Sequence, residues 1–288
     1  MAGREHIWTG PEHNQVDCAL VSSEALRQVP AHRVATDGSA SEAVAESVPV
    51  VVESAVTIDV DGVDSFTLLC TPGDAPALAA GFLLGEGIID EAGDIAAIRP
   101  CADDPAVVRV KLRRGAERIG DQSRNLLVAS SCGLCGAGAL DHRLAALPRV
   151  ADTLRISRAV LRRAGEALRQ RQFLFDACGG THAAGIFDAK GELRQWAEDT
   201  GRHHALDKAI GKCLLAGVPT AGCGAVLSGR ASIELVAKCA RAGIELLATV
   251  SAPTSLAVEV AERCNITLCA FVRETRATIF SHQRRVTS

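Results

Sequence analysis

The sequence predicts an α/β protein in two parts, a β-rich N-terminal subdomain and a C-terminal domain with an at least partly parallel sheet. Two observations predict this fold class. In the N-terminal part, two runs of β-forming residues flank Asp61-Gly62, a strong hairpin signal because both turn residues tolerate a positive φ. In the C-terminal part, short strands alternate with helices from residue 173 onward, which favours right-handed crossovers between parallel strands.

The N-terminal elements follow from local signals. The hairpin strands are expected at Val56–Val60 and Val63–Leu69, and a helix is expected after Thr71-Pro-Gly-Asp, with Gly87 as its C-cap. Further elements are expected as strands at 107–112 and 126–129, a helix at 139–147, and a helix from 157 to 170 whose N-cap is Ser157.

The C-terminal elements are expected in alternation. They are a strand pair at 183–187 and 193–196, helices at 203–215, 231–242 and 255–264, strands at 225–228, 246–250 and 267–272, and a final strand or edge hairpin at 277–280. Ligands of such sheets bind beyond the carboxyl ends of the strands. The loops that begin at Ser228 and Ser251 lie at two such ends, and their free backbone N–H groups suit anions, phosphates included.

The chain divides into four expected segments. Residues 1–45 lack sustained hydrophobic periodicity, so we expect a mostly flexible leader, with a first strand near Arg33 as an option. Ordered structure is expected to begin at Val48. The other segments are a β-rich N-terminal subdomain with one helix at 46–130, a Cys-Gly loop with connecting helices at 131–172, and a C-terminal α/β domain at 173–288.

The composition is that of a globular protein and excludes several function classes. The 288 residues are 48% hydrophobic and 23% charged, which excludes a disordered or collagen-like chain. No apolar run reaches the roughly 18 residues of a membrane span, and the first residues lack the apolar segment of a secretory signal. A net charge of −3 argues against a protein that coats nucleic acid. We therefore expect a cytoplasmic protein that binds neither membranes nor nucleic acid.

The segment Cys132-Gly-Leu-Cys135-Gly is the most informative stretch. The eleven cysteines of the chain are an odd number without an export signal, so most are expected to be reduced thiols. The spacing fits half of a zinc site, a redox dithiol or a sulfur-carrying thiol; two unreactive thiols in a turn are disfavoured by the flanking glycines. A second Cys-x-x-Cys and the His-x-Glu of a zinc deaminase are both absent from the sequence, so no metal is expected.

The position of these cysteines favours reactivity. Gly136 leads into an expected helix, so Cys132 and Cys135 are expected near the positive end of a helix dipole. Such a position lowers the pKa of a thiol and raises its thiolate fraction. This argument does not decide between disulfide exchange and sulfur transfer.

A second group of ionisable residues follows in the C-terminal part. His182 lies in a Gly-Gly-Thr-His run, and Arg202, His203, Asp207 and Lys208 are expected in the first turns of a helix, directly after the acidic pair 198–199. A solvated helix face with local ion pairs is one interpretation. The other is a site for pyrophosphate or another anion, because cations at a helix N-terminus are unfavourable without negative charge nearby.

Three further arginines support the anion interpretation. Arg230, Arg273 and Arg276 lie at expected carboxyl ends of strands and add planar hydrogen-bond donors. Together they indicate a nucleotide-like polyanion as ligand.

Seven runs of residues resemble, in order, the formate dehydrogenase accessory sulfurtransferases, the FdhD family. The resemblance extends from about Val48 to Phe280. It departs from the family pattern at Thr200 and at His204, which stands where the family usually has Asn. The runs lie at 71–74, 81–89, 131–136, 179–184, 198–203, 227–232 and 250–259.

The resemblance implies a cytoplasmic, homodimeric sulfur carrier. Such proteins take persulfide sulfur from a cysteine desulfurase and transfer it to the molybdenum cofactor, Mo-bis(molybdopterin guanine dinucleotide), which formate dehydrogenase then receives. By motif, Cys132 would hold the persulfide and Cys135 would assist. Segment 173–288 would be the cofactor-binding domain, similar to the cytidine deaminase fold without its zinc chemistry. The residues expected to bind the cofactor are Phe271, Val272, Arg273, Glu274, Thr275 and Arg276, together with His182, Arg202 and Arg230.

Two other classes of function remain open at this point. A chaperone that only binds and protects the molybdenum cofactor would need the arginines and not the thiols. A thiol–disulfide oxidoreductase is disfavoured because no thioredoxin-like strand pattern precedes Cys132. Alanine variants of Cys132 and Cys135 separate sulfur transfer from the chaperone role.

Overall fold

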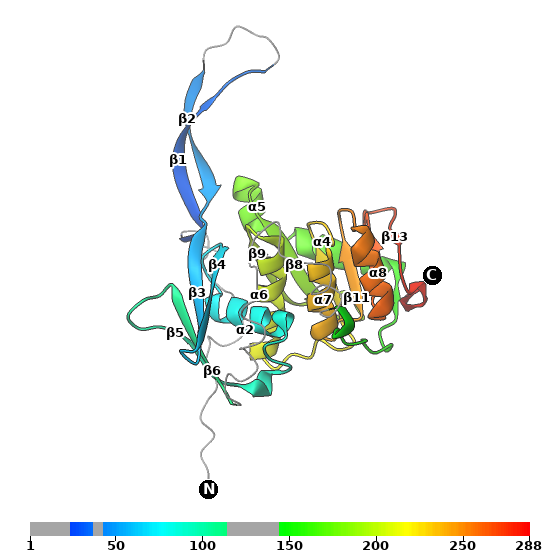
Figure 1. The fold of residues 1–288 in the computed structure, drawn as a ribbon. Helices are drawn as coiled ribbons and strands as arrows, with labels where there is room; N and C mark the ends of the chain where they lie inside the picture. Colours follow the sequence, from blue (N-terminus) through cyan, green and yellow to red (C-terminus); the bar gives the residue numbers. More distant parts are fainter. Residues whose placement is uncertain (1–23, 37–42, 114–143) are drawn as a thin grey trace.

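The structure is a computed structural model that describes residues 24–36, 43–113 and 144–288. The strand expected at 126–129, most of the helix expected at 139–147, and both cysteines of the Cys-Gly-Leu-Cys segment lie outside these residues. An N-terminal sheet and a larger C-terminal α/β unit lie side by side, and a two-stranded arm projects away from both (Figure 1). No helix within the described ranges is both long and apolar enough to cross a bilayer.

The arm consists of β1 (Leu26–Arg33) and β2 (Val44–Val51), paired antiparallel from Leu26↔Val51 to Arg33↔Val44. The expected strand near Arg33 is confirmed, and the expected start of ordered structure at Val48 is wrong. The reason is physical: most side chains of β1 and β2 are exposed or only partly buried, so a hydrophobic alternation that could reveal a strand is weak.

The N-terminal sheet has the strand order β4-β3-β6-β5. Its hairpin turn is the expected one, with positive φ at Asp61 (55°) and Gly62 (66°). β6 then returns parallel to β3, and the strand expected at 107–112 is confirmed. The strands are β3 (Ser54–Val60), β4 (Asp64–Cys70), β5 (Ile95–Pro100), which a 3₁₀ turn η1 (Ala92–Asp94) precedes, and β6 (Val107–Leu112).

Helix α2 (Ala75–Glu86) joins the two parts of the molecule. It ends where the sequence indicates, at Gly87, whose φ of 75° lets its N–H bond back to the Leu83 and Leu84 carbonyls. The helix is buried on all sides, between the N-terminal sheet and helix α6. The approach to α6 is backbone to backbone: a Cβ atom at Gly81 would lie 1.9 Å from the Asp207 carbonyl oxygen.

The C-terminal sheet has the order β13-β12-β11-β10-β8-β9 among the described residues. β10, β11 and β12 are parallel, and β13, β8 and β9 are antiparallel to their neighbours, so the expectation of a partly parallel sheet is confirmed. The strands are β8 (His182–Phe187), β9 (Leu193–Asp199), β10 (Gly224–Leu227), β11 (Leu246–Thr249), β12 (Thr267–Ala270) and β13 (Thr278–Ile279).

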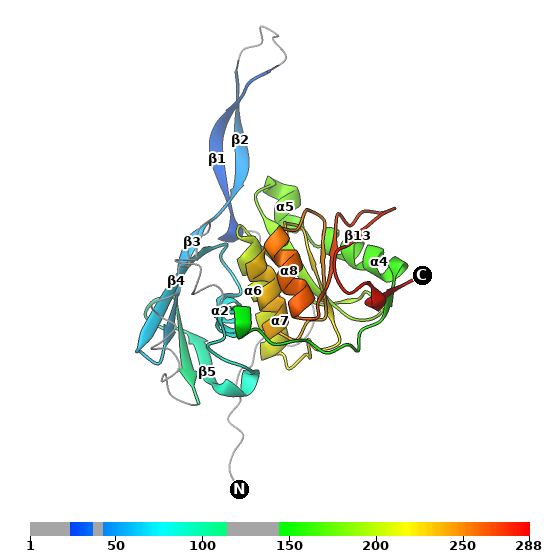
Figure 2. The ribbon, with the colours of Figure 1, turned by 45° about the vertical axis from the view of Figure 1, so that its right-hand side comes forward.

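Helices cover both faces of this sheet. α6, α7 and α8 lie next to one another on one face, and α4 packs on the other (Figure 2). Neighbouring strand residues accordingly enter different cores: Leu247 belongs to the hydrophobic cluster that includes residues of α6, α7 and α8, and Ala248 belongs to the one that includes Leu161 of α4. The helices are α4 (Arg158–Arg169, with Ser157 as N-cap), α5 (Phe173–Cys178), α6 (Arg202–Leu215), α7 (Ile233–Arg241) and α8 (Ser255–Arg263).

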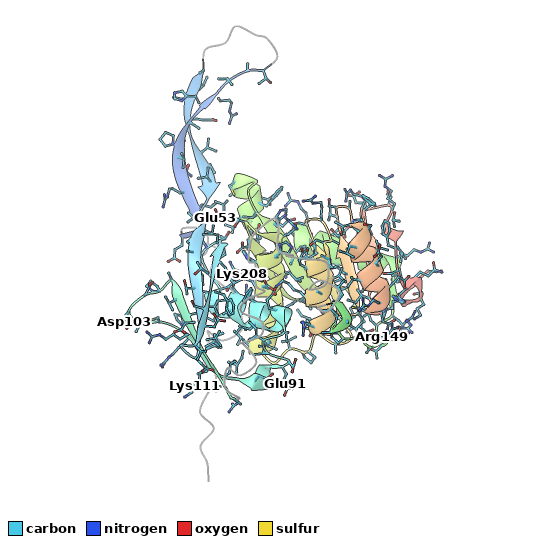
Figure 3. The ribbon with its side chains drawn as sticks, viewed as in Figure 1. Glu53, Glu91, Asp103, Lys111, Arg149 and Lys208 are labelled. Carbon is cyan, nitrogen blue, oxygen red and sulfur yellow. The ribbon has the colours of Figure 1, made fainter. Side chains whose placement is uncertain are left out.

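Charged side chains are buried where α6 meets α2 and α7. Asp207 and Lys208 are each 1% exposed, so the interpretation of this helix face as solvated is wrong. Lys208 lies between the two parts of the molecule, whereas Asp103 and Arg149 lie at the periphery (Figure 3). Asp207 pairs with Lys238 of α7 at 2.7 Å, which offsets the cost of removing both charges from water.

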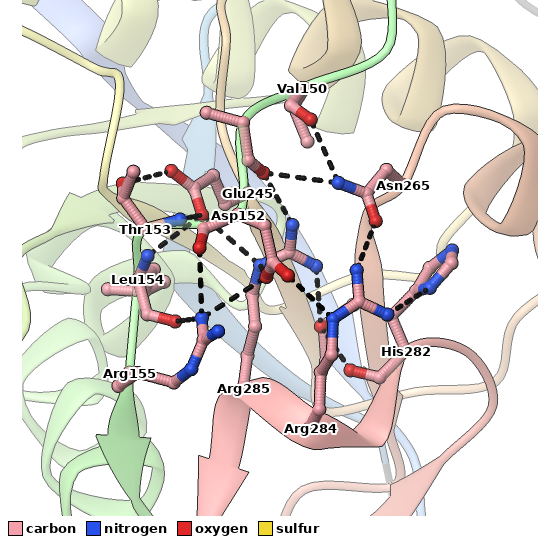
Figure 4. Close-up of polar contacts among 12 residues, drawn as sticks. Val150, Asp152, Thr153, Leu154, Arg155, Glu245, Asn265, His282, Arg284 and Arg285 are labelled. Atoms are coloured by element: carbon pink, nitrogen blue, oxygen red, sulfur yellow. Dashed lines mark hydrogen bonds and ion pairs between the residues drawn. The ribbon is translucent and has the colours of Figure 1, made fainter.

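The C-terminus is held by a second buried network (Figure 4). The Glu245 carboxylate accepts hydrogen bonds from Thr153 N at 2.7 Å, Leu154 N at 2.8 Å and Arg285 Nε at 3.2 Å. Glu245 and Arg285 have no exposed surface, and this set of donors satisfies the buried charge. The network fixes a short parallel pairing of β7 (Ile156–Ser157) with β14 (Val286–Thr287), which follows the 3₁₀ turn η4 (Gln283–Arg285).

Candidate anion-binding site

The loops after the parallel strands form one continuous edge of the C-terminal sheet. Thr249 Oγ1 donates to the Gly229 carbonyl, which joins the ends of β11 and β10. Ala231 N donates to the Ala252 carbonyl at 3.1 Å, and Phe271 N donates to the Ser251 carbonyl at 3.1 Å. The carboxyl ends of β10, β11 and β12 therefore lie in a row, which is where ligands bind in sheets of this kind.

Cationic residues from three elements meet at the β10 end of this edge. β8 runs antiparallel to β10, so its first residue, His182, lies beside the end of β10. Arg202 opens α6, and Arg230 follows β10 and is exposed. His182 and Arg202 both approach Gly229, since a Cβ atom there would lie 3.3 Å from His182 Nδ1 and 3.4 Å from the Arg202 side chain.

The electrostatics show how close these cations are. Burial lowers the pKa of Arg202, and the charge of Arg230 lowers it further. Burial also lowers the pKa of His182, with further contributions from Arg202 and His203. Arg202 Nε is buried and finds no acceptor among the residues that the structure describes. Like charges gathered in this way favour an anion as their partner.

Two helix N-termini add hydrogen-bond donors at the same place. α6 begins after Gly201, which has no side chain to cap the helix, and α7 begins after Ser232, whose side chain does not bond the first turn. The two ends are adjacent, since His203 Nε2 lies 3.3 Å from Ser232 Oγ. Uncapped N–H groups and the positive dipole end both favour negative charge.

Asp199 lies behind this site, but its charge is already engaged. Its Oδ2 is 2.7 Å from Lys208 Nζ and accepts from Thr71 N at 3.1 Å, and its Oδ1 accepts from Gly201 N at 2.9 Å. Burial raises the pKa of this carboxyl, yet His204 and Lys208 beside it lower the pKa overall. Asp199 is therefore a buried carboxylate that orients the start of α6.

The N-terminal part contributes to the site through Thr71. Besides the bond from its N–H to Asp199, Thr71 accepts from Thr200 N at 3.0 Å through Oγ1 and from Lys208 Nζ at 2.7 Å through its carbonyl. The loop before α2 thus fixes the loop before α6. Sequence reasoning singled out both loops as motifs but could not pair residues 128 positions apart.

The Phe271–Arg276 segment lies on the same edge, beyond the Ser251 loop. It connects β12 to β13; Val272 is buried, whereas Phe271, Arg273, Glu274, Thr275 and Arg276 are exposed. Arg273 donates to the Val250 carbonyl. Of the predicted cofactor-binding residues, the structure thus brings His182, Arg202 and Arg230 together and places the C-terminal stretch further along the row.

The thiols within the described residues are poor candidates for sulfur chemistry. Burial raises the pKa of Cys213, Cys239 and Cys269 to about 12, and the thiolate is the reactive form. Cys178, at the end of α5, is the one described thiol that is not buried. Within the described ranges, no three or more His, Cys, Asp or Glu side chains are grouped so that they could hold a metal ion. Cys132 and Cys135 lie outside these ranges.

The fold and the site define an α/β protein with clustered cations and two helix N-termini at one edge of its larger sheet. The chain belongs to the FdhD/NarQ family, whose model matches residues 51–287, and the resemblance seen in the sequence is confirmed.

Two relatives and one solved structure illustrate the match. The sulfur carrier protein FdhD of Bordetella bronchiseptica is 41% identical over 251 residues, covering 86% of this chain and 91% of the relative. The sulfur carrier protein FdhD of Mycolicibacterium paratuberculosis is 40% identical over 270 residues, covering 90% and 99%. The crystal structure of a protein from Desulfotalea psychrophila, described as a formate dehydrogenase accessory protein, has a TM-score of 0.73 at 22% identity and covers 91% of this chain and 100% of that one.

Proposed function

We propose that this protein is a cytoplasmic, homodimeric sulfur carrier that takes persulfide sulfur from a cysteine desulfurase and delivers it to Mo-bis(molybdopterin guanine dinucleotide) for formate dehydrogenase. The names of its relatives support the sulfur-carrying role. The proposal that the protein binds the molybdenum cofactor rests on one observation: Arg202, Arg230 and His182 meet at one edge of the sheet. A cytidine deaminase-like arrangement of this domain stays a prediction.

The first chemical step is thiol–persulfide exchange. The Cys132 thiolate attacks the terminal sulfur of the desulfurase persulfide, the S–S bond of the donor breaks, and the donor leaves as a thiolate. The new S–S bond leaves Cys132 as Cys–S–SH. The reaction conserves charge and electrons, so it needs no further oxidant.

The second step passes the outer sulfur to the cofactor. When Cys135 attacks Cys132, a disulfide forms and the outer sulfur leaves as HS⁻, a ligand for molybdenum. The two cysteine sulfurs lose the two electrons that the departing sulfur gains, and a cellular dithiol then reduces the disulfide. In the direct alternative, the outer sulfur would pass to the metal as sulfide, a reduced molybdenum centre would supply the two electrons, and Cys132 would be left as a thiol.

The site residues suit the diphosphates of a guanine dinucleotide. One guanidinium group can donate two parallel hydrogen bonds to two oxygens of a phosphate. The buried Arg202 Nε has no acceptor among the described residues and is therefore available for such a bond. The N-termini of α6 and α7 offer further N–H groups. Phe271 and Arg276 are exposed and lie further along the same edge. There they could contact a part of this long cofactor away from the phosphates at Arg202.

The substitution Arg202→Gln tests this assignment. A hydrogen bond to a charged group contributes about 1.5–3 kcal/mol, so the affinity for guanosine diphosphate should fall about 10- to 100-fold, measured by calorimetry. The matched control is Arg162→Gln on α4, an exposed arginine paired with Glu166, which should leave binding unchanged. If the wild type and Arg202→Gln bind guanosine diphosphate equally well, this edge of the sheet is not the cofactor site.

The pH dependence of the same titration gives an independent readout. Burial, together with neighbouring cations, holds the pKa of His182 below its ordinary value of 6.5. A bound anion favours the protonated ring, so binding should tighten as the pH falls below 6.5 in the wild type. His182→Gln should flatten this dependence.

A further inference from the structure

One carboxylate faces the cationic cluster from the first turn of α7. The side chain of Glu234 places Oε2 at 3.8 Å from His203 Nε2, and its charge acts on Arg202. The Ser232 hydroxyl lies 3.3 Å from the same His203 nitrogen. Glu234 thus occupies the uncapped start of α7, the position that the physical argument above assigns to an external anion.

We propose that Glu234 is the resident counter-ion of the anion site, which a bound phosphate group must displace from His203, Arg202 and the α7 N-terminus. The proposal rests on the proposed function, since it concerns the site assigned there to the cofactor's phosphates. It adds a residue that the sequence analysis did not select and a control on how tightly the site holds its ligand.

Glu234 differs in kind from the other nearby carboxylate. Asp199 is fully buried, and Lys208 and backbone N–H groups engage both of its oxygens, so it cannot move out of the site. The side chain of Glu234 is 52% exposed. It can rotate into water without breaking any core packing, and this makes displacement physically accessible.

The charge state of Glu234 is consistent with this role. Contact with His203, followed by the Ser232 hydroxyl and the α7 backbone, lowers the pKa of Glu234 to about 2 despite its partial burial. The carboxylate is therefore ionised throughout the physiological range, and it neutralises part of the cationic cluster in the free protein.

Displacement carries a cost that is nearly the same for every anion. Each ligand loses the attraction between Glu234 and the cations before it gains its own. Glu234 therefore lowers the affinity for phosphate, pyrophosphate and guanosine diphosphate by similar factors. For a carrier that must hand its ligand on, a weaker hold speeds release, because affinity differences at one site appear mostly in the dissociation rate.

The test compares the wild type with Glu234→Gln, which keeps the shape of the side chain and removes its charge. Orthophosphate, pyrophosphate and guanosine diphosphate are each titrated by calorimetry, and dissociation of a fluorescent guanosine diphosphate is followed by stopped flow. At low salt we expect about three- to tenfold tighter binding of all three and slower release. The gain should shrink at high salt, because salt screens the removed charge.

Glu166→Gln on α4 is the matched control, since it also removes an exposed, ion-paired glutamate, and it should leave all three affinities unchanged. Unchanged affinity in Glu234→Gln would overturn the proposal. Weaker binding would overturn it as well and would instead make Glu234 an acceptor for donors on the ligand. If neither the wild type nor Glu234→Gln binds any of the three anions, the proposed site and the role of Glu234 fail together, whereas unchanged affinity in a protein that binds them overturns the role of Glu234 alone.

Discussion

Replacing Cys132 by alanine is expected to abolish the activation of formate dehydrogenase while leaving guanosine diphosphate binding unchanged. Without the thiol, no persulfide can form on this residue, and the buried thiols of the described chain cannot substitute because burial keeps them protonated. Cys135→Ala is expected to fail in the same way. The measurement is formate dehydrogenase activity in cells that lack their own carrier and express each variant.

Cys178→Ala is the matched control for this experiment. Cys178 is the one described cysteine that is not buried. The variant therefore tests whether the loss of any accessible thiol abolishes formate dehydrogenase activation. Full activity of Cys178→Ala, together with inactive Cys132→Ala and Cys135→Ala, supports sulfur transfer. If Cys132→Ala and Cys135→Ala both sustain full activity, the protein acts as a cofactor-binding chaperone and the sulfur-transfer proposal fails.

Gly211→Leu is expected to cause the largest loss of stability. Even a Cβ atom at Gly211 would lie 1.8 Å from the Ala77 carbonyl oxygen, so α2 and α6 would have to separate where the two parts of the molecule join. Overpacking against backbone of this kind should cost about 3 kcal/mol or more. For a chain of this size we expect the melting temperature to fall by about 6–12 °C, measured by thermal and urea unfolding.

Gly165→Ala in α4 is the control for the glycine substitutions. It is also a helix glycine, but a Cβ atom there would meet nothing within 4 Å, so alanine should raise stability by about 0.5–1 kcal/mol. A Gly211→Leu variant as stable as the wild type would contradict the close packing of α2 on α6. Gly85, also in α2, reflects the packing of this helix on α7 instead, since a Cβ atom there would meet the Lys238 side chain at 2.8 Å.

Local signals were sufficient to predict much of the fold. The Asp61-Gly62 hairpin, the α2 stop at Gly87 and the Ser157 N-cap all depend on residues adjacent in sequence, and each is confirmed. Helix α5 was missed because its start is held from a distance: Leu174 N and Phe175 N donate to Glu198, more than 20 residues away. No local pattern contains that contact.

The residues of the candidate site could be predicted from local motifs, but their meeting in space could not. The rule that ligands bind beyond carboxyl strand ends pointed to Arg230, and the motif around His182 and Arg202 pointed to the other cations. That these three residues meet depends on the antiparallel placement of β8 beside β10, which the alternation of elements does not specify. The burial of Lys208 likewise depends on the packing of α2 on α6, and the sequence shows it only as one more charge on a helix.

The central claim is that Cys132 carries sulfur, and mass spectrometry of the protein after incubation with a cysteine desulfurase and cysteine tests it most directly. The account predicts that the peptide containing Cys132 gains the mass of one sulfur atom, that dithiol treatment removes it, and that Cys132→Ala shows no such gain. Sulfur found only on another cysteine, or on none, would contradict the account.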